Sequence, residues 1–174
     1  MNMIRDHSQP FVEILTLALA DEAFALDACM VSEIIDVVPV TEVPNAPNYA
    51  QGLINVRGKV VPLADLRVCL DLPRLPATID TRLVVLELVI DDEPGWIGIY
   101  ADKVYEVTKI SASAIEAPPE VGLKWPSLFI RGIARRGADL LYILDLEAIF
   151  SSIRQETAGD FHDADRSRAM LATH

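Results

Sequence analysis

The chain has 174 residues, of which 51% are hydrophobic and 24% charged, and its formal net charge at pH 7 is −11. A negative charge of this size repels phosphate backbones and anionic lipids at long range, so we do not expect nucleic acid as a partner. Charge-free apolar runs such as Leu83 to Leu86 are far shorter than the ~20 residues that a membrane-spanning helix needs, so we expect no direct membrane insertion.

No basic leader or small-residue cleavage site precedes Phe11, so we expect no secretory signal and a cytoplasmic location. The chain has two cysteines, Cys29 and Cys69, and they are not clustered. In a cytoplasmic protein, two such cysteines are expected to be buried thiols rather than a disulfide.

Short strands separated by turns are predicted for the start of the chain. Hydrophobic residues alternate within Phe11 to Leu19, as in a half-buried strand, and a turn at Asp21-Glu22 leads to a return strand, Ala23 to Leu26. Residues 28–35 fit either a short helical turn or a bent strand. Three prolines then break any regular element between Val37 and Tyr49, which we expect to be a long surface connection.

A hairpin is predicted next, because Leu53 to Val56 and Lys59 to Leu63 flank Arg57-Gly58, and glycine adopts a positive φ at no steric cost. A helical turn is expected after the hairpin, over Asp65 to Leu70. Asp65 lies near its start, where a carboxylate can cap free backbone amides.

The second half of the chain follows the same order. Leu83 to Ile90 is typical of a strand that is buried on both faces, and Asp91 to Gly95 forms its turn. A proline-containing loop over residues 117–127 then leads to a second hairpin over residues 128–144. A C-terminal helix is expected over Leu146 to Arg154.

An internal repeat accounts for this similarity between the halves. Gly52 to Leu66 (GLINVRGKVVPLADL) returns 80 positions later as Gly132 to Leu146 (GIARRGADLLYILDL), without a gap. Upstream, Val31 to Ile34 and Val104 to Val107 share the pattern V-x-E-[IV] at an offset of 73. A long unit that is present only twice indicates duplicated domains rather than an open array.

Short strands, Pro/Gly turns and few helices predict an all-β sandwich or a pair of barrels. The repeat predicts a first barrel over residues 11–80 and a second over residues 81–150. Pairing of the N-terminal strand across the barrels is an alternative. The polar segment 157–174 is expected to be a mobile tail.

Catalytic chemistry is not expected. A duplicated aspartate, Asp65 and Asp145, suggests a proton-sharing dyad, but the Asp-Leu context differs from the Asp-Thr/Ser-Gly turn of such dyads. Helix capping is favoured, and Asp65→Asn would then cost about 1 kcal/mol of stability. The three histidines lie in the terminal segments, at His7, His162 and His174. With no Cys/His cluster, nucleophile elbow or phosphate-binding loop, we expect no metal, no cofactor and no catalytic residues.

Arg57 is the clearest candidate for a binding residue. It lies at the predicted hairpin tip, where its guanidinium offers five donors to a carboxylate or backbone carbonyl of a partner. An intramolecular bridge to Glu33 is an equal alternative.

The V-x-E-[IV] pattern at Val31 to Ile34, the proline-containing loop and GLINVRGKVVPLADLR together resemble the CheW family of bacterial chemotaxis coupling proteins, over about Phe11 to Phe150. The resemblance implies a mainly β fold of two pseudo-symmetric, five-stranded SH3-like barrels, here followed by the C-terminal helix. It also implies a non-enzymatic adaptor in the cytoplasm, associated with membrane receptor arrays. The expected partners are the cytoplasmic tip of a chemoreceptor (methyl-accepting chemotaxis protein) and the histidine kinase CheA.

Receptor contact in this family occurs in a groove between the barrels, and the resemblance assigns five residues of this chain to it. They are Val31, Glu33, Arg57, Val104 and Val107. The aliphatic residues would hold the apolar face of a helix, and the charged pair would set its register. Plain barrel core is the alternative for the aliphatic residues. A small-ligand sensor that uses the cleft between the barrels is the alternative function, and an aspartic-type hydrolase is a weaker one.

Two features depart from the family pattern. Arg135 and Arg136 make the second hairpin tip more basic than the resemblance predicts, and the segment after Thr157 has no clear counterpart. CheW domains also occur inside CheA and, joined to a receiver domain, in CheV. This chain has room for neither a kinase core nor a receiver.

Overall fold

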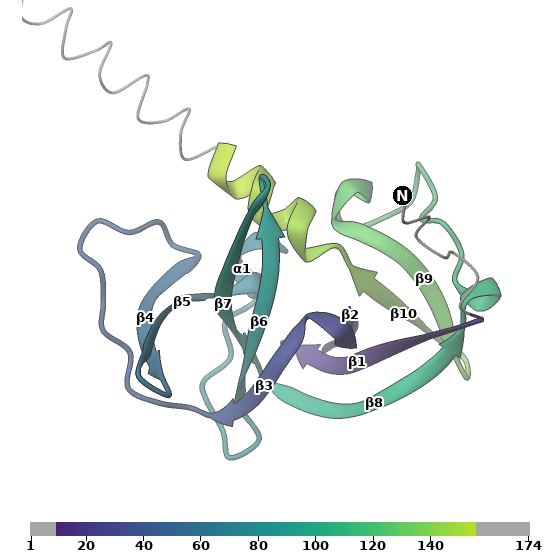
Figure 1. Ribbon diagram of the computed structural model, residues 1–174. Helices are drawn as coiled ribbons and strands as arrows, with labels where there is room; N and C mark the ends of the chain where they lie inside the picture. The colour runs from purple at the N-terminus through teal and green to yellow at the C-terminus, as the bar shows by residue number, and fades with distance from the viewer. Residues whose placement is uncertain (1–9, 156–174) are drawn as a thin grey trace, which may run out of the picture.

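The computed structural model describes residues 10–155, and it contains two five-stranded sheets that lie next to each other (Figure 1). From edge to edge, the first sheet contains β8 (Lys103–Ser111), β1 (Phe11–Leu19), β2 (Glu22–Asp27), β10 (Asp139–Leu144) and β9 (Ile130–Arg136). The second contains β3 (Val31–Asp36), β6 (Arg82–Ile90), β7 (Glu93–Ala101), β5 (Lys59–Ala64) and β4 (Ala50–Val56).

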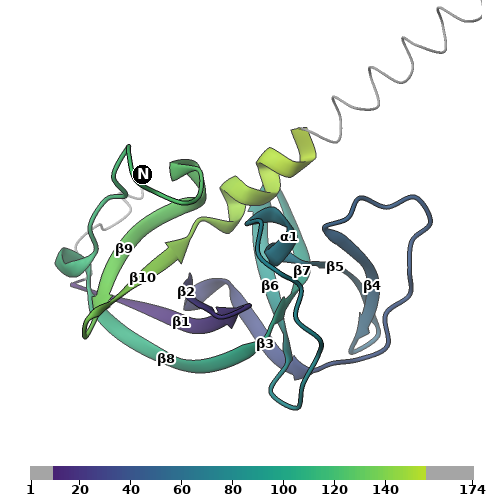
Figure 2. The same ribbon diagram turned by 180° about the vertical axis from the view of Figure 1, so that it is seen from behind.

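The helices are short. Three 3-10 turns, η1 (Ala28–Met30), η2 (Ala112–Ala114) and η3 (Ser127–Phe129), accompany a one-turn helix, α1 (Leu66–Cys69). A further helix covers residues 146–155 and lies across the tops of both sheets (Figures 1 and 2). The mainly β fold with two five-stranded sheets and a C-terminal helix is therefore confirmed. The predicted tail, residues 157–174, lies outside the described residues.

Each sheet takes strands from both halves of the chain, so the sheets do not follow the predicted division into residues 11–80 and 81–150. The β1–β2 hairpin joins the three strands of the second half, with β1 antiparallel to β8 and β2 parallel to β10. The β6–β7 hairpin joins the three strands of the first half. The reason is that the chain crosses from one sheet to the other after β2 and again after β7, which sequence similarity between the halves does not reveal.

The repeat is visible in the strand register. Gly52 pairs with Leu63 in the β4–β5 hairpin, and Gly132 pairs with Ile143, 80 positions later, in the β9–β10 hairpin. Both predicted hairpins are therefore confirmed. The segment 28–35 combines both interpretations of its pattern, because the η1 turn is followed directly by strand β3.

The core has three parts. A small cluster fills each sheet's own interior, for example Ile54 with Leu83 and Ile14 with Leu141. A larger cluster joins the sheets and the helix of residues 146–155. Burying one Leu or Phe side chain stabilises the fold by roughly 1.5–3 kcal/mol, so this shared cluster fixes the two sheets as one body. Of the two thiols expected to be buried, Cys29 is exposed.

Candidate functional site

Strands β3 and β8 are edge strands of different sheets, and both views place β3 beside the start of β8 (Figures 1 and 2). Val31 lies opposite Leu86, and Val104 lies opposite Leu17. Both valines are partly buried against the core cluster that the two sheets share. The alternative that the aliphatic residues are barrel core therefore applies in part to Val31 and Val104, which lie where the two sheets meet.

Further along the two edge strands, aliphatic side chains are exposed to solvent. Val107 is 57% exposed and Ile34 is 41% exposed. Their partners across the strands, Leu15 and Val84, are buried in the shared core. Opposite residues in an antiparallel pair project from the same face of the sheet. The surface at β3 and β8 therefore continues the apolar core outward into solvent.

Arg57 lies at the tip of the β4–β5 hairpin with a positive φ of 50°, followed by Gly58 at 82°. Its Nε lies 3.2 Å from Oε2 of Glu33 on β3, and the two side chains are 81% and 20% exposed. The intramolecular bridge is therefore present. An ion pair this exposed contributes only about 0–1 kcal/mol, and most of the guanidinium remains accessible to a partner.

The catalytic dyad has no support in the geometry, because each aspartate is engaged in its own helix. Asp65 accepts from the backbone amide of Arg67 at 3.0 Å, and Asp145 accepts from that of Ala148 at 3.0 Å. Both predicted helix caps are confirmed. Within residues 10–155, no group of three or more His, Cys, Asp or Glu side chains is arranged to hold a metal ion.

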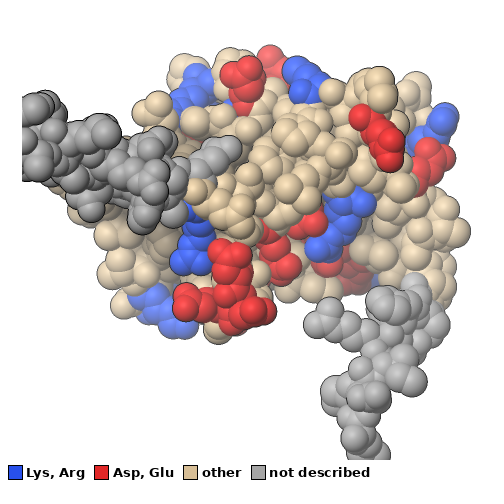
Figure 3. All heavy atoms as spheres, turned by 90° about the horizontal axis from the view of Figure 1, so that it is seen from above, with Lys and Arg blue, Asp and Glu red and all other residues tan. Residues whose placement is uncertain are grey.

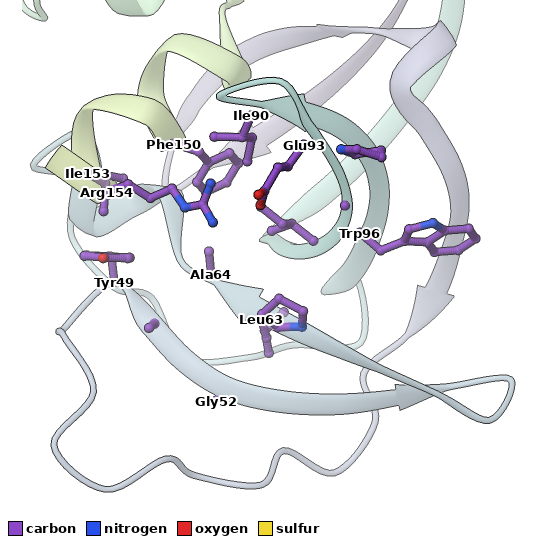
Figure 4. Close-up of a pocket in the computed structure, with 15 residues that line it drawn as sticks. Tyr49, Gly52, Leu63, Ala64, Ile90, Glu93, Trp96, Phe150, Ile153 and Arg154 are labelled. Carbon is purple, nitrogen blue, oxygen red and sulfur yellow. The ribbon is translucent and has the colours of Figure 1, made fainter. Parts of the chain in front are cut away.

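An apolar cavity of about 300 Å³ lies between the second sheet and the C-terminal helix (Figure 4). Leu63, Ile90 and Phe150 line it, and Figure 4 shows Glu93 and Arg154 pointing toward each other across it. None of the five predicted receptor-contact residues lines this cavity. The cavity therefore does not coincide with the cleft that the small-ligand alternative requires.

Charged side chains are mixed on the face seen from above, where blue and red groups are interspersed over the surface (Figure 3). No broad basic surface of the kind that tracks a phosphate backbone is visible on this face. Among the helices in the described part of the chain, none has the length and apolar character needed to cross a membrane.

Comparison with known proteins identifies relatives. The family model for the CheW-like domain matches residues 13–154. The chain is 30% identical to the chemotaxis protein CheW of Klebsiella aerogenes over 80% of this chain and 82% of that protein. It is also 30% identical to the chemotaxis protein CheW of Bacillus subtilis, over 84% of this chain and 91% of that protein. The crystal structure of the scaffolding protein TtCheW from Thermoanaerobacter tengcongensis matches with a TM-score of 0.72 and 30% identity, over 86% and 94% of the two chains.

Proposed function

We propose that this chain, which belongs to the family of CheW-like domains, is a scaffold without catalytic turnover that couples chemoreceptors to the histidine kinase CheA. Relatives named chemotaxis protein CheW, and a structural neighbour named a scaffolding protein, support this role. The protein would act in the cytoplasm, at the receptor tips of membrane arrays. It would need no cofactor, because holding partners together requires only complementary surfaces.

The observation that carries the proposal is the apolar surface of β3 and β8, which is partly buried where the two strands meet and exposed further along each strand. An amphipathic helix sets its apolar face into such a surface. Val107 would serve as an apolar anchor, and the half-buried Val31 and Val104 would form the floor beneath the helix. Buried apolar anchors of this kind carry most of the affinity in protein interfaces.

Glu33 and Arg57 would set the position of the helix along this surface. Both belong to elements next to the apolar residues, and Arg57 is held at the hairpin tip by its bridge to Glu33. A carboxylate of the receptor can bind the free donors of the guanidinium without displacing Glu33. Rim charges of this kind affect orientation and association rate more than they affect total affinity.

The test is calorimetric titration of the full chain with a purified receptor signalling fragment. Arg57→Glu should weaken binding by about tenfold or more, which corresponds to ~1.4 kcal/mol, and Arg57→Ala should weaken it less. The melting temperature should hardly change, since exposed substitutions usually alter stability by less than about 0.5 kcal/mol. Arg154→Glu is a control, because Arg154 is likewise an exposed arginine in an ion pair, with Asp91, but lies on the C-terminal helix.

Equal affinity of the wild type and Arg57→Glu for the fragment would show that Arg57 is not in the receptor site. A change in stability with unchanged binding would assign Arg57 to a structural role alone. A pull-down with purified CheA tests the second half of the proposal independently. Absence of CheA from the pull-down, with receptor binding retained, would reject the coupling role.

A further inference from the structure

The chain passes from the second sheet to the first through a single residue. Strand β7 ends at Ala101 and β8 begins at Lys103, so Asp102 alone connects the two strands. The other passage, from Asp27 at the end of β2 to Val31 at the start of β3, contains the three residues of η1. Because the connection is so short, the direction in which β8 leaves the second sheet depends directly on how Asp102 is held.

Contacts from both sheets hold Asp102. Its backbone amide donates to the carbonyl of Ala18 on β1 at 2.9 Å, and its Oδ2 accepts from the amide of Ala20 at 2.6 Å. Its Oδ1 accepts at 2.9 Å from Nη1 of Arg67, on the helix α1 that follows the β4–β5 hairpin. One carboxylate therefore joins the β1–β2 turn of the first sheet to the helix that follows the last strand of the β4–β5 hairpin in the second.

Arg67 is itself fixed in place. Its side chain is 8% exposed, and its Nε and Nη2 each bind an oxygen of Asp65 at 2.9 Å. Its Nη1 also donates to the carbonyl of Leu75 at 3.2 Å. A planar guanidinium with this many directional hydrogen bonds has one orientation. The contact between Arg67 and Asp102 is thus a rigid link between the sheets.

The two ends of this link lie next to the two halves of the proposed receptor surface. Val104 is two residues after Asp102, and Val107 lies further along the same strand. On the other side, the β4–β5 hairpin has Arg57 at its tip, and its strand β5 ends one residue before Asp65. A helix that contacts both halves at once binds most tightly when the halves are already in register, because preorganisation lowers the cost of binding.

The apolar core that the two sheets share does not replace this link. Burial of apolar surface is non-directional and depends mainly on the area removed from water. Hydrogen bonds weaken steeply when their angle changes. The shared core therefore holds the sheets together, whereas the polar link selects the angle at which β8 begins.

We propose that Asp102 is a positioning residue for receptor binding. It fixes the start of β8, and with it Val104 and Val107, relative to Glu33 and Arg57 of the second sheet. The inference rests on the proposed function. Asp102 acts through these residues without touching the receptor, which agrees with a side chain that is only 14% exposed.

The experiment is calorimetric titration of the full chain with the receptor signalling fragment. In Asp102→Asn an amide nitrogen replaces one of the two oxygens, so either Ala20 or Arg67 loses its acceptor. Binding should weaken by about fivefold or more, because the partner must then restore the register between the halves of its site. Thermal melting of every variant establishes that the titrated protein is folded.

A double-mutant cycle with Arg57→Glu distinguishes positioning from a general loss of stability. Arg57→Glu should weaken binding by about tenfold in the wild type but by only about threefold in Asp102→Asn, because the hairpin tip is then out of register with β8. A lower stability alone acts on all contacts equally and leaves the two effects on affinity additive.

Leu141→Ala is the control for stability. Leu141 is buried in the small core cluster inside the first sheet, apart from the link. Its truncation leaves a cavity and should lower the melting temperature at least as much as Asp102→Asn does. Affinity for the fragment should nevertheless stay within about twofold of the wild type.

Additive effects of Arg57→Glu and Asp102→Asn would overturn the inference, and so would wild-type affinity in Asp102→Asn. If Asp102→Asn does not fold, Arg67→Lys takes its place in the cycle under the same criteria, because lysine keeps the charge but lacks the fork that binds both carboxylates. Absence of binding by the wild type would reject the proposed function itself, and the inference with it.

Discussion

Asp65 and Asp145 stand 80 positions apart in the repeat, and each caps the helix that follows it, yet their surroundings differ. Asp65 has no exposed surface, and its two oxygens accept from Nε and Nη2 of Arg67 at 2.9 Å each. Asp145 is half-buried, and Glu147 occupies the position that corresponds to Arg67. The repeat therefore retains the cap in both halves, whereas within residues 10–155 only the Asp65 cap also forms a buried ion pair.

Arg67 also contacts the connection between β7 and β8, where the chain passes from the second sheet to the first. Its Nη1 lies 2.9 Å from Oδ1 of Asp102, in the connection between β7 and β8. Oδ2 of Asp102 accepts from the amide of Ala20, in the turn between β1 and β2. The hydrogen bond to Asp65 raises the pKa of Arg67 above its ordinary value, although burial acts in the opposite direction. A buried polar network thus holds one crossing.

The other crossing, between β2 and β3, has a weaker counterpart. Nη1 of Arg131 lies 3.4 Å from Oδ2 of Asp27, and the two side chains are 41% and 26% exposed. Exposed pairs contribute little to stability, whereas breaking a buried pair leaves an uncompensated charge. The comparison teaches that sequence similarity between the halves does not imply equal energetics at equivalent positions.

Matched substitutions of the two caps should show the largest effect. Asp65→Asn should destabilise the fold by about 3 kcal/mol, because Arg67 stays buried with one carboxylate partner fewer. Asp145→Asn should cost about 1 kcal/mol or less, because it alters only a helix cap. Capping alone predicts about 1 kcal/mol for Asp65→Asn, and the buried ion pair adds to this expected loss. Urea unfolding of both variants measures the difference, and equal losses would contradict the comparison.

Gly52 and Gly132 occupy equivalent positions in the two hairpins. They test whether equivalent backbone positions of the two halves also differ in energy. Gly52 has a φ of +140°, and an added Cβ would overlap the carbonyl oxygen of Thr41, a backbone atom of the adjoining segment. An added Cβ at Gly132 would first meet Cγ2 of the Ile115 side chain, which can rotate or shift.

Gly52→Ala should therefore cost about 2–3 kcal/mol and Gly132→Ala about 1–2 kcal/mol, as expected for overpacking. Thermal or urea unfolding of the two variants provides the measurement. A larger loss for Gly132→Ala would show that the Ile115 side chain is held more rigidly than the Thr41 backbone.

Local patterns predicted most elements of the fold, because the information for them lies within short stretches. The hairpin around Arg57-Gly58 and the helix caps depend on neighbouring residues only. Pairing of the N-terminal strand across the barrels, which β1 makes with β8, was predicted only as an alternative. The rest of the exchange of hairpins was not predictable in this way, since β2 pairs in parallel with β10, which is more than 110 positions away. The alternation of hydrophobic residues within β2 predicts which side chains face the core, but it does not predict which strands lie beside β2 in the sheet.

The candidate site was predictable to a similar extent. The resemblance assigned Arg57 and Glu33, and the structure pairs them. The corresponding ion pair of the first sheet, between Glu106 and Arg136, was missed, because the arginine is displaced by one position in the repeat. The signal that could have found it is the second V-x-E-[IV] pattern, which places Glu106 at the position of Glu33.

The smallest predicted effect concerns Tyr100. This residue lines a polar pocket with Asp65, Arg67 and Asp102, so it adjoins the buried ion pair and not the cap at Asp145. Burial raises the pKa of Tyr100, and the Asp65 carboxylate raises it further, while Arg67 lowers it. In the unfolded chain a tyrosine loses its proton near pH 10. The folded protein retains this proton to a higher pH, so between the two pKa values the folded state binds more protons than the unfolded state.

The stability that Tyr100 contributes should therefore be fully present below about pH 10 and be lost as the pH rises through the folded pKa, with a slope of at most ~1.4 kcal/mol per pH unit. Tyr100→Phe keeps the ring that lies 5.7 Å from Arg67 and removes the titrating hydroxyl. Urea unfolding at pH 9 and pH 11 should show a smaller decrease in the free energy of unfolding for Tyr100→Phe than for the wild type. An identical decrease would mean that the phenol titrates alike in both states, and that the buried network does not extend its electrostatic influence to Tyr100.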